Sequence, residues 1–551
     1  MNQEFIDRVT EWIAGDPDIE DRETLELLVR DGAEAELERR FAAPLRFGTA
    51  GLRGPVMAGP AGMNRYTVRR ATQGVVAWLS ELGVDLERGV VVGRDARHGS
   101  EAFNDEVVAV LLGAGVRVHE MPGPLPTPYV AYAVKALGAV AGIMITASHN
   151  PPGDNGYKLY AGDGAQIIAP HDAVVERYAA SAPAPALGDR SSALHRVVGP
   201  ELFEAYRDHF VGRFGVGASD LAITYTPLHG VGGASMMSLF AAAGFERVTP
   251  VAAQFEPDPR FPTLAFPNPE EPGALDLAMQ VAEQTSSSLV IANDPDADRL
   301  GAAVRGPRGW RVLRGDEIGW LLASALWDSV VASDDTVATT LVSSTMLEAM
   351  ARERHVRYVT TLTGFKWLSR AAGAGTLRFA YEEALGYAVD PAVADKDGLS
   401  AALALCRLAH ELESAGQSLA DRLDEIEAHF GVHAGAQLAL RAQGPTAHDD
   451  IARVLERLRG TPPSRLGPLA VTGVVDLARG WNGLESTEGV LIALGENARV
   501  VVRPSGTEAK LKAYLEVRGA PIDLGEVVLE RQRAGAVIDA VREDLARLLA
   551  F

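Results

Sequence analysis

Short apolar runs rich in β-branched residues alternate along the chain with Ala- and Leu-rich stretches of about 10–18 residues that have helical character. Several apolar runs end in polar, glycine-containing loops, as in RGVVVGRDARHGS, AGIMITASHNPPG, LAITYTPLHGVGG, SSLVIANDPDADR and VRYVTTLTGFK. This alternation predicts βαβ units and mainly parallel sheets. Because ligands bind at the carboxyl ends of strands in such sheets, these loops are expected to line a common crevice.

The pattern changes at several places that suggest boundaries between parts of the chain. Residues 1–40 have the character of one or two acidic helices. Linker-like composition occurs at Ser181–Ala193 and at Ala439–His448. Beyond the second of these, two strand-like runs flank RPSGTEAKLK and a terminal helix follows. The C-terminal part is therefore expected to differ in architecture from the rest.

Length, charge and cysteine content narrow the functional class. The chain has 551 residues, too many for one hydrophobic core, and its formal net charge of −21 argues against a general nucleic-acid or anionic-membrane surface. Cys406 is the only cysteine in the sequence, so a reducing compartment is expected. The N-terminus lacks the pattern of a signal peptide, and no apolar run reaches the roughly 18 residues of a membrane span. We expect a soluble, cytoplasmic protein in which local cations hold any anionic ligand.

Lysine is scarce, since only six of the 52 cationic residues are lysines. Codon usage explains the bias, but a lysine that persists is more often one whose compact ammonium is required. Lys135 lies on an Ala-rich helical stretch and is expected at the surface. The other lysines fall in or beside the segments that carry candidate chemistry: Lys158, Lys366, Lys396, Lys510 and Lys512.

Three alternating carboxylates follow the apolar run SSLVIAN. Asp294, Asp296 and Asp298 repel one another, so the loop would be costly to bury without a cation. A hard divalent ion such as Mg²⁺ accepts oxygen ligands of this kind and leaves positions for a phosphate oxygen. The loop is not an EF-hand, because Arg299 and Arg305 stand where that motif requires Gly and Glu. The alternative is a solvated acidic turn.

The segment VVRPSGTEAKLKAY combines a guanidinium, two hydroxyls and turn residues. Arg503, Ser505, Gly506 and Thr507 suit a tetrahedral phosphate dianion. A β-turn built on Pro504 and Gly506 is the alternative. A P-loop is excluded, because the sequence contains no Gly-Lys dipeptide.

The segment FAYEEALGYAVDPAVADKDG places paired carboxylates at the end of a strand-like run. Glu382 or Glu383 could accept two sugar hydroxyls, and Lys396 could serve phosphate binding or proton transfer. Taken alone, such a glutamate pair is more often a solvated strand edge.

The segment MITASHNPPGDNGYKL places Ser148, His149 and Lys158 among rigid turn residues. An α/β-hydrolase elbow would need glycine at Thr146 and Asn150, which argues against acyl transfer. A serine that accepts phosphate needs a metal, a nearby base and a second phosphate anchor. The chain supplies all three in separate segments, so phosphoryl transfer through Ser148 is favoured.

These segments together resemble a known group of enzymes. TASHNPPGDNGYK, DPDADR, YEEALGY and RPSGTE occur in the order found in the α-D-phosphohexomutase superfamily, and the resemblance covers roughly residues 40 to 520. FGTAGLRG, TPLHG and TGFKW resemble more narrowly the branch containing phosphopentomutase and glucose-1,6-bisphosphate synthase. The resemblance implies a heart-shaped enzyme with three related α/β domains and a smaller C-terminal α+β domain.

The resemblance also implies how the chain is divided and which residues act. The implied parts are a helical extension over residues 1–40, a domain with the phosphoserine loop over 41–200 and a domain with the metal loop over 201–313. A domain with the sugar-reading loop over 314–440 and a domain with the phosphate-binding loop over 441–551 follow. Ser148, as the phosphoserine, would complete a Mg²⁺ site with Asp294, Asp296 and Asp298. The implied catalytic set is Ser148, His149, Lys158, Arg53, Arg299 and Lys396. The implied substrate contacts are Gly364, Phe365, Lys366, Glu382, Arg503, Ser505, Gly506 and Thr507.

The implied reaction interconverts sugar 1-phosphate and 6-phosphate, with α-D-glucose as the first expectation and mannose as the second. It would pass through a bisphosphorylated sugar and need a trace of a sugar bisphosphate, such as glucose 1,6-bisphosphate, as activator. Phosphopentomutase activity on ribose or deoxyribose 1-phosphate and sugar-bisphosphate synthesis are the alternatives. Ala384 replaces a serine found in most relatives, and Leu385-Gly386-Tyr387 replaces a loop that ends in histidine in bacterial relatives, so the reaction is better defined than the sugar. A phosphatase and a regulatory sugar-phosphate-binding protein are further alternatives.

Overall fold

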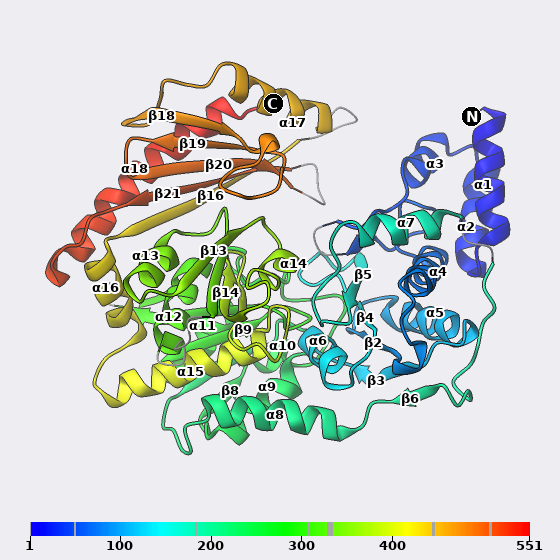
Figure 1. Cartoon of the computed structure of the whole chain (residues 1–551), viewed down its shortest axis with the longest axis horizontal. Coiled ribbons are helices and arrows are strands. Elements are labelled where there is room, and N and C mark those ends of the chain that lie inside the picture. The colour runs from blue at the N-terminus through cyan, green and yellow to red at the C-terminus, as the bar shows by residue number, and fades with distance from the viewer. Residues whose placement is uncertain are drawn as a thin grey trace. The chain divides into compact units, whose positions relative to one another are not determined.

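The order of helices and strands follows the alternation expected from the sequence (Figure 1). The computed structural model describes residues 2–48, 51–181, 184–306, 309–327, 334–442, 447–505 and 510–551. The chain divides into two units, Met1–Leu313 with Gly386–His410, and Arg314–Leu385 with Glu411–Phe551. The first unit therefore combines two segments that are separated in the sequence.

The first unit begins with three amphipathic helices, α1 (Gln3–Gly15), α2 (Ile19–Arg30) and α3 (Glu34–Phe41). Side-chain caps define two of their starts, since Asn2 accepts a hydrogen bond from the amide of Phe5 and Asp18 accepts one from the amide of Glu20. Their apolar faces meet in a small core that includes Val9, Trp12, Leu25, Leu37 and Phe41. The helical character expected for residues 1–40 is thus confirmed, but the segment forms three helices and not the expected one or two.

The next sheet has the strand order β1-β5-β4-β2-β3-β6. Its strands are β1 (Leu52–Pro55), β2 (Val90–Arg94), β3 (Val118–Pro124), β4 (Ala141–Ile145), β5 (Asp154–Ala161) and β6 (His195–Val197). The helices around it are α4 (Arg65–Glu81), α5 (Ser100–Gly113), α6 (Thr127–Ala136) and α7 (His171–Ser181). Strands β4, β2, β3 and β6 pair in parallel, whereas β5 and β1 are antiparallel to their neighbours.

Alternation along the strands explains why helices cover both faces of this sheet. In β4, Ala141, Ile143 and Ile145 belong to the core shared with α4, α5 and α7. The intervening Gly142 lies against α6, where a Cβ at that position would come within 2.6 Å of Val134. Strand β4 is buried throughout and ends directly before the segment that contains Ser148.

The second sheet has the order β11-β10-β9-β7-β8. It follows α8 (Pro200–Phe214) and comprises β7 (Ile223–Thr226), β8 (Val248–Pro250), β9 (Leu289–Asn293), β10 (Leu300–Gly306) and β11 (Gly309–Val312), with helices α9 (Gly233–Ala243), α10 (Ala252–Phe255) and α11 (Asp276–Gln284). Strand β9 is fully buried and turns through the Asp loop into the antiparallel strand β10. The chain returns to this unit with β15 (Gly386–Ala388) and the start of α15 (Gly398–Ser414).

The second unit contains a parallel set of strands and an antiparallel sheet. The parallel strands β12 (Asp335–Thr340), β13 (Arg357–Thr361) and β14 (Thr376–Glu382) are accompanied by α12 (Gly315–Leu326), α13 (Met346–Glu353), α14 (Phe365–Leu368) and α16 (Leu419–Phe430). The antiparallel sheet has the order β16-β21-β20-β19-β18-β17. Its elements are β16 (His433–Arg441), β17 (Arg465–Leu466), β18 (Leu469–Asp476), β19 (Val490–Leu494), β20 (Ala498–Pro504) and β21 (Lys510–Arg518), with helices α17 (Ala447–Gly460) and α18 (Val527–Leu548).

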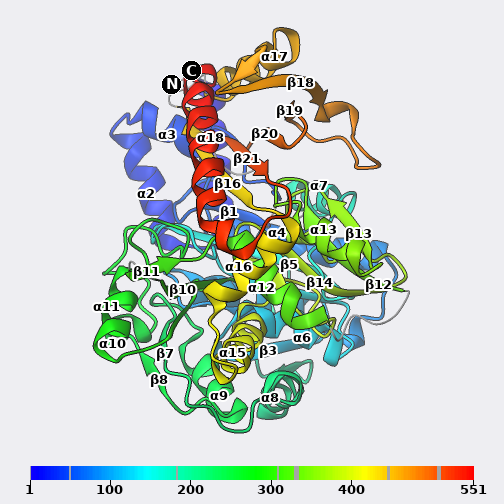
Figure 2. The same ribbon diagram turned by 90° about the vertical axis from the view of Figure 1, so that its left-hand side faces the viewer.

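Helices α17 and α18 share one core with the antiparallel sheet, and Figure 2 shows α18 running along strands β16 and β21. This arrangement confirms the expected α+β character of the C-terminal part, and the layered sheets confirm the α/β class of the rest. The expectation of mainly parallel sheets is right for the central strands, but β1, β5, β10 and β11 are antiparallel additions. Among the described residues, each helix is either too short or too polar to cross a lipid bilayer.

Candidate active site

Ser148 lies just after β4, on a backbone that L-residues seldom adopt. Its φ of 52° is in the left-handed region, where a residue with a Cβ is strained. The Ser148 amide donates a hydrogen bond to Thr146 Oγ1 at 2.9 Å, and the Ser148 hydroxyl donates to Asp294 Oδ2 at 2.8 Å. Nδ1 of His149 lies 3.1 Å from the same hydroxyl. The serine oxygen is therefore held in a fixed direction, toward the Asp loop.

The Asp loop brings the three predicted carboxylates together. Asp294, Asp296 and Asp298 are completely buried, and each offers an oxygen within 4.8 Å of the others. Oδ1 of Asp296 and Oδ1 of Asp298 are buried without a hydrogen-bond partner, which is rare for polar atoms inside proteins. Carboxylate oxygens are the ligands that Mg²⁺ and other hard cations prefer. The residues thus fit a divalent metal ion, as the sequence predicts.

Two lysines hold the other oxygens of the same carboxylates. Lys158 Nζ lies 2.7 Å from Asp296 Oδ2 and 2.6 Å from Asp298 Oδ2, and Lys396 Nζ lies 2.9 Å from Asp298 Oδ2. Only 1 % of the Lys158 side chain is exposed. Buried carboxylates are tolerated when opposite charges offset them, so these ammonium groups stabilise the loop and orient its carboxylates.

Lys396 is positioned by the residue that follows it. Asp397 Oδ1 accepts a hydrogen bond from the Leu399 amide at 3.0 Å, in the first turn of α15. Asp397 Oδ2 accepts one from the hydroxyl of Tyr206, on α8, at 2.7 Å. The segment that brings Lys396 to the Asp loop is therefore anchored at both a helix start and a buried tyrosine.

The charges of the site shift the pKa values of its members. Burial raises the pKa of Asp294 well above its usual range, and the carboxylates of Asp296 and Asp298 add to this effect. Burial acts in the same direction on Asp296, but the charge and hydrogen bond of Lys158 hold its pKa below the usual range. Burial, together with the nearby guanidinium groups, holds the pKa of His149 well below that of an ordinary histidine. Neutral histidine is therefore the favoured form beside Ser148.

Both predicted arginines of this unit lie at the site. The loop that follows β4 and carries Ser148 and Asn150 is called the serine loop below. The Arg53 guanidinium, on β1, donates to Asn150 Oδ1 of this loop at 2.9 Å. The Arg299 amide donates to Asp294 Oδ1 at 3.0 Å, and its guanidinium lies 3.5 Å from Glu270. Arg53, Ser148, His149, Lys158, Arg299 and Lys396 are thus gathered with the three aspartates in the first unit.

Arg97 is a positioning residue that the sequence did not single out. Its guanidinium donates to the carbonyl oxygens of Ser148 and Asn150 at 2.6 Å each, of Pro151 at 2.8 Å and of Asp154 at 3.1 Å. The side chain is buried beside Asp95, and the Phe261 ring covers it at 5.0 Å. The single guanidinium of Arg97 thereby binds four carbonyl oxygens in and beside the serine loop. The available signal was its place in RGVVVGRDARHGS, one of the loops that end an apolar run.

The Asp loop has supports of its own that sequence reasoning also missed. Thr127 Oγ1, at the start of α6, donates to Asp296 Oδ2 at 2.6 Å, and the Thr127 amide donates to the Asp296 carbonyl at 2.9 Å. In the TPLHG segment, a Cβ at Gly230 would come 2.3 Å from Pro295 Cα, so only glycine allows this approach. No local pattern marks Thr127, whereas TPLHG lies in LAITYTPLHGVGG, one of the apolar runs that end in a glycine-containing loop.

The remaining predicted residues belong to the second unit. Gly364 has a φ of 112° and precedes α14, where Phe365 is buried and the Lys366 ammonium lies 6.0 Å from the Trp367 ring centre. Glu382 ends β14 and is half-buried. Glu383 accepts hydrogen bonds from Ser343 Oγ at 3.1 Å and from Thr340 Oγ1 at 3.3 Å.

The phosphate-loop residues lie at the end of the hairpin formed by β20 and β21. Arg503 pairs with Lys512 across the hairpin, and the Ser505 amide donates to the Lys510 carbonyl at 2.8 Å. The predicted residues Gly506 and Thr507 lie outside the described residues. Strand pairing therefore fixes the base of this loop.

Family models match the chain along most of its length. Those for the phosphoglucomutase/phosphomannomutase alpha/beta/alpha domains I, II and III match residues 44–184, 204–308 and 314–430, and that for the C-terminal domain matches residues 419–522. These matches include each segment on which the sequence resemblance rests.

Similar proteins carry names of related activities. A Haemophilus influenzae protein named "Probable phosphomannomutase" is 38% identical over 477 residues, covering 85% of this chain and 96% of that protein. Mouse phosphopentomutase is 34% identical, covering 95% of this chain and 91% of its own length. Orang-utan (Pongo abelii) glucose 1,6-bisphosphate synthase is 32% identical, covering 97% and 93%. A crystal structure of a phosphoglucomutase/phosphomannomutase family protein from Burkholderia thailandensis has the same fold, with a TM-score of 0.68, 19% identity and coverage of 91% and 97%.

Arg97→Lys should lower the apparent free energy of unfolding by roughly 2–4 kcal/mol, because an ammonium cannot serve four carbonyls and leaves buried acceptors unpaired. Arg94→Lys is the matched control. Arg94 ends β2, three residues before Arg97, but contacts Asp95 and Glu101 only at 3.4 and 3.6 Å, so its change should stay within about 0.5 kcal/mol. Denaturant unfolding measures both variants. Equal losses would show that Arg97 does not hold the serine loop.

Proposed function

The chain belongs to the phosphoglucomutase/phosphomannomutase family and is a phosphotransferase isomerase, and we propose that it interconverts α-D-glucose 1-phosphate and 6-phosphate through a phosphoserine at Ser148. The observation that carries the proposal is the bond from Ser148 Oγ to Asp294, beside two partnerless oxygens of Asp296 and Asp298. A nucleophilic serine beside a cation site suits phosphoryl transfer, in which charge must be offset at the reacting oxygens. The proposed partners are small sugar phosphates, and the proposed location is the cytoplasm.

In the proposed cycle, the phosphoserine P–O bond breaks as the phosphorus bonds to a sugar hydroxyl. The product is a bisphosphorylated sugar, which turns over and returns its other phosphate to Ser148. A trace of glucose 1,6-bisphosphate would load the serine initially. The sugar hydroxyl loses its proton as it attacks, and the Ser148 oxygen that leaves the phosphorus takes one up. We propose Lys158 and Lys396 as the residues of this proton exchange, in which the one that accepts the sugar proton acts as a neutral amine.

Mg²⁺ held by Asp294, Asp296 and Asp298, with a phosphoserine oxygen, would supply Lewis-acid stabilisation of the charge on the transferring group. The chain's own guanidinium groups would add to this, since Arg53 and Arg299 lie beside the serine and Asp loops. Neutral His149 would contact the Ser148 oxygen.

The other proposed contacts lie in the second unit. Gly364, Phe365 and Lys366 would form a sugar-side loop, Glu382 would accept sugar hydroxyls, and Arg503, Ser505, Gly506 and Thr507 would bind the phosphate that is not reacting. The proposed domain bounds remain 41–200, 201–313, 314–440 and 441–551.

Pentose phosphate is the second candidate substrate. It is favoured by the identity to phosphopentomutases and by Ala384, which takes a hydroxyl away from the sugar-reading segment. A site with fewer polar partners discriminates less strongly between sugars. Sugar-bisphosphate synthesis has similar support from a relative of that name.

Ser148→Ala should slow turnover roughly 10³-fold or more, because the covalent route is lost. Intact-mass measurement of the wild type should show partial occupancy by one phosphoryl group at Ser148, absent from the variant. Ser191→Ala, an exposed serine, should keep both phosphate and activity. Turnover of Ser148→Ala close to that of the wild type would contradict the phosphoserine mechanism.

Chelation of Mg²⁺ should abolish transfer while the circular dichroism spectrum is retained. Asp296→Asn should weaken Mg²⁺ binding measured by titration calorimetry at least about tenfold, because it removes one of three ligand charges. Asp208→Asn, which changes an exposed aspartate on α8, should bind Mg²⁺ as the wild type does. Full activity in the chelated enzyme would exclude the metal assignment.

Comparison of kcat/KM on glucose, mannose, ribose and deoxyribose 1-phosphates tests the sugar. We expect glucose to be preferred and Ala384→Ser to sharpen that preference by about 1–2 kcal/mol, the scale of one hydrogen bond. Ala374→Ser, at an exposed position, should leave the preference unchanged. A preference of the wild type for a pentose of more than about tenfold, roughly 1.4 kcal/mol, would replace the hexose proposal by the pentose one.

A further inference from the structure

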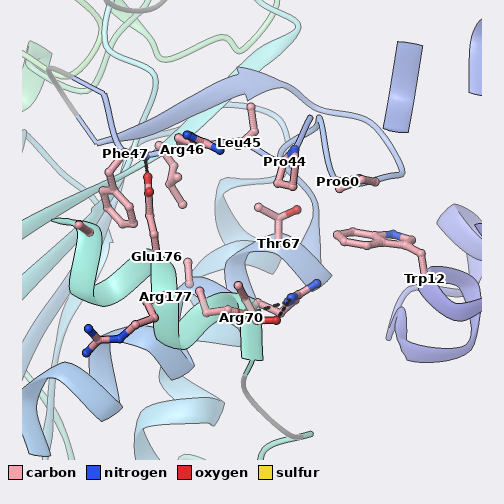
Figure 3. Close-up of a pocket in the computed structure, with 15 residues that line it drawn as sticks. Trp12, Pro44, Leu45, Arg46, Phe47, Pro60, Thr67, Arg70, Glu176 and Arg177 are labelled. Atoms are coloured by element: carbon pink, nitrogen blue, oxygen red, sulfur yellow. Dashed lines mark hydrogen bonds between the residues drawn. The ribbon is translucent and has the colours of Figure 1, made fainter. Parts of the chain in front are cut away.

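A cavity lies in the first unit and shares no lining residue with the candidate active site. Its volume is about 440 Å³, within the range of small-molecule sites. The N-terminal helices, the segment before β1, and helices α4 and α7 surround it (Figure 3). Neither the sequence motifs nor the proposed reaction gives this cavity a role.

The walls of the cavity are mainly apolar. Pro44, Leu45 and Pro60 lie on one side, and alanines of α4 and α7 lie opposite them. Figure 3 shows the six-membered ring of the Trp12 indole and the side chain of Thr67 directed toward the open space. A flat apolar group would therefore find a ring edge and aliphatic surfaces to contact.

Charged groups at the cavity are predominantly positive. Arg46, Arg70 and Arg177 line it together with a single carboxylate, Glu176. Arg70 donates to the carbonyls of Ala179 and Ala180 at 3.0 and 2.8 Å, which hold its guanidinium in place without neutralising it.

The carboxylate and one arginine have other partners. Glu176 Oε1 accepts the Phe47 amide at 2.6 Å. The guanidinium of Arg177 pairs with Glu81 and points away from the cavity in Figure 3. Arg70 and Arg46 are therefore left as the cations for a ligand, in a protein whose net charge is −21.

We infer that this cavity binds a small organic anion with a flat apolar ring. The ring would lie against Trp12 and the prolines, and the anionic group would meet Arg70, whose guanidinium already lies 5.8 Å from the Trp12 ring. Charge complementarity selects an anion, and the apolar walls select a ring over a fully polar metabolite.

Occupancy of the cavity has a direct route to the active site. One wall of the cavity, its roof, includes Phe47 and Leu52, and Leu52 directly precedes Arg53 in β1. The bond from the Phe47 amide to Glu176 ties this roof to α7 on the floor. A ligand that contacts both roof and floor biases this segment, and so the cavity is a regulatory site that acts on Arg53.

The binding test uses 8-anilinonaphthalene-1-sulfonate, an anion with a flat naphthalene ring that fluoresces in apolar sites, with equilibrium dialysis for stoichiometry. One molecule should bind per chain, and saturating inorganic phosphate should not displace it. Arg70→Gln should weaken binding at least about tenfold, whereas Arg70→Lys, which keeps the charge, should weaken it less. Ala173→Trp, which fills the cavity from its exposed side, should abolish binding without changing any charge.

The coupling test uses hydrogen exchange of the Phe47 amide. The probe should slow this exchange in the wild type and leave it unchanged in Ala173→Trp. Binding of wild-type strength in both Ala173→Trp and Arg70→Gln would overturn the proposed site. Unchanged exchange at Phe47 in the probe-saturated wild type would overturn its regulatory role. Neither readout involves turnover, so a different reaction at Ser148 would leave both results unaffected.

Discussion

The burial of three carboxylates on one short loop is the constraint on which the first unit depends. Charges of the same sign cannot be removed from water together unless cations and donors accompany them. Strand β5 supplies Lys158, the returning segment supplies Lys396, and the start of α6 supplies Thr127. The need of the buried carboxylates for cations and hydrogen-bond donors thus fixes the positions of three separate elements.

The serine loop, which faces the Asp loop, is also held in place by buried hydrogen bonds. Ser148 is held in a left-handed conformation, a strain that persists because Arg97 binds the surrounding carbonyls and Thr146 binds the amide. Phosphoryl transfer depends chiefly on positioning, so a rigid serine facing a rigid carboxylate set is the arrangement that the chemistry favours. The rigidity is produced by buried hydrogen bonds, since the turn residues alone do not align the hydroxyl with Asp294.

Sequence reasoning succeeded where the informative residues are neighbours in the chain. The alternation of apolar runs and the contiguous Asp and Ser segments predicted the layers, the carboxylate cluster and its proximity to Ser148. It missed contacts between distant segments, because Arg97 meets Ser148 across 51 positions and Thr127 meets Asp296 across 169. The resemblance placed Lys158 in the catalytic set without naming its partners, and the structure shows its ammonium on carboxylates 138 and 140 positions away. No local pattern encodes such partners.

The first unit is interrupted in the sequence, since it leaves at Leu313 and resumes at Gly386. During synthesis, β5 and the Asp loop emerge from the ribosome before Lys396, by a delay on the order of ten seconds at ordinary elongation rates. For that interval the carboxylates have Lys158 but lack their second ammonium and the α15 anchor behind it. The set of ammonium groups around this loop is therefore complete only after the later segment has been synthesised.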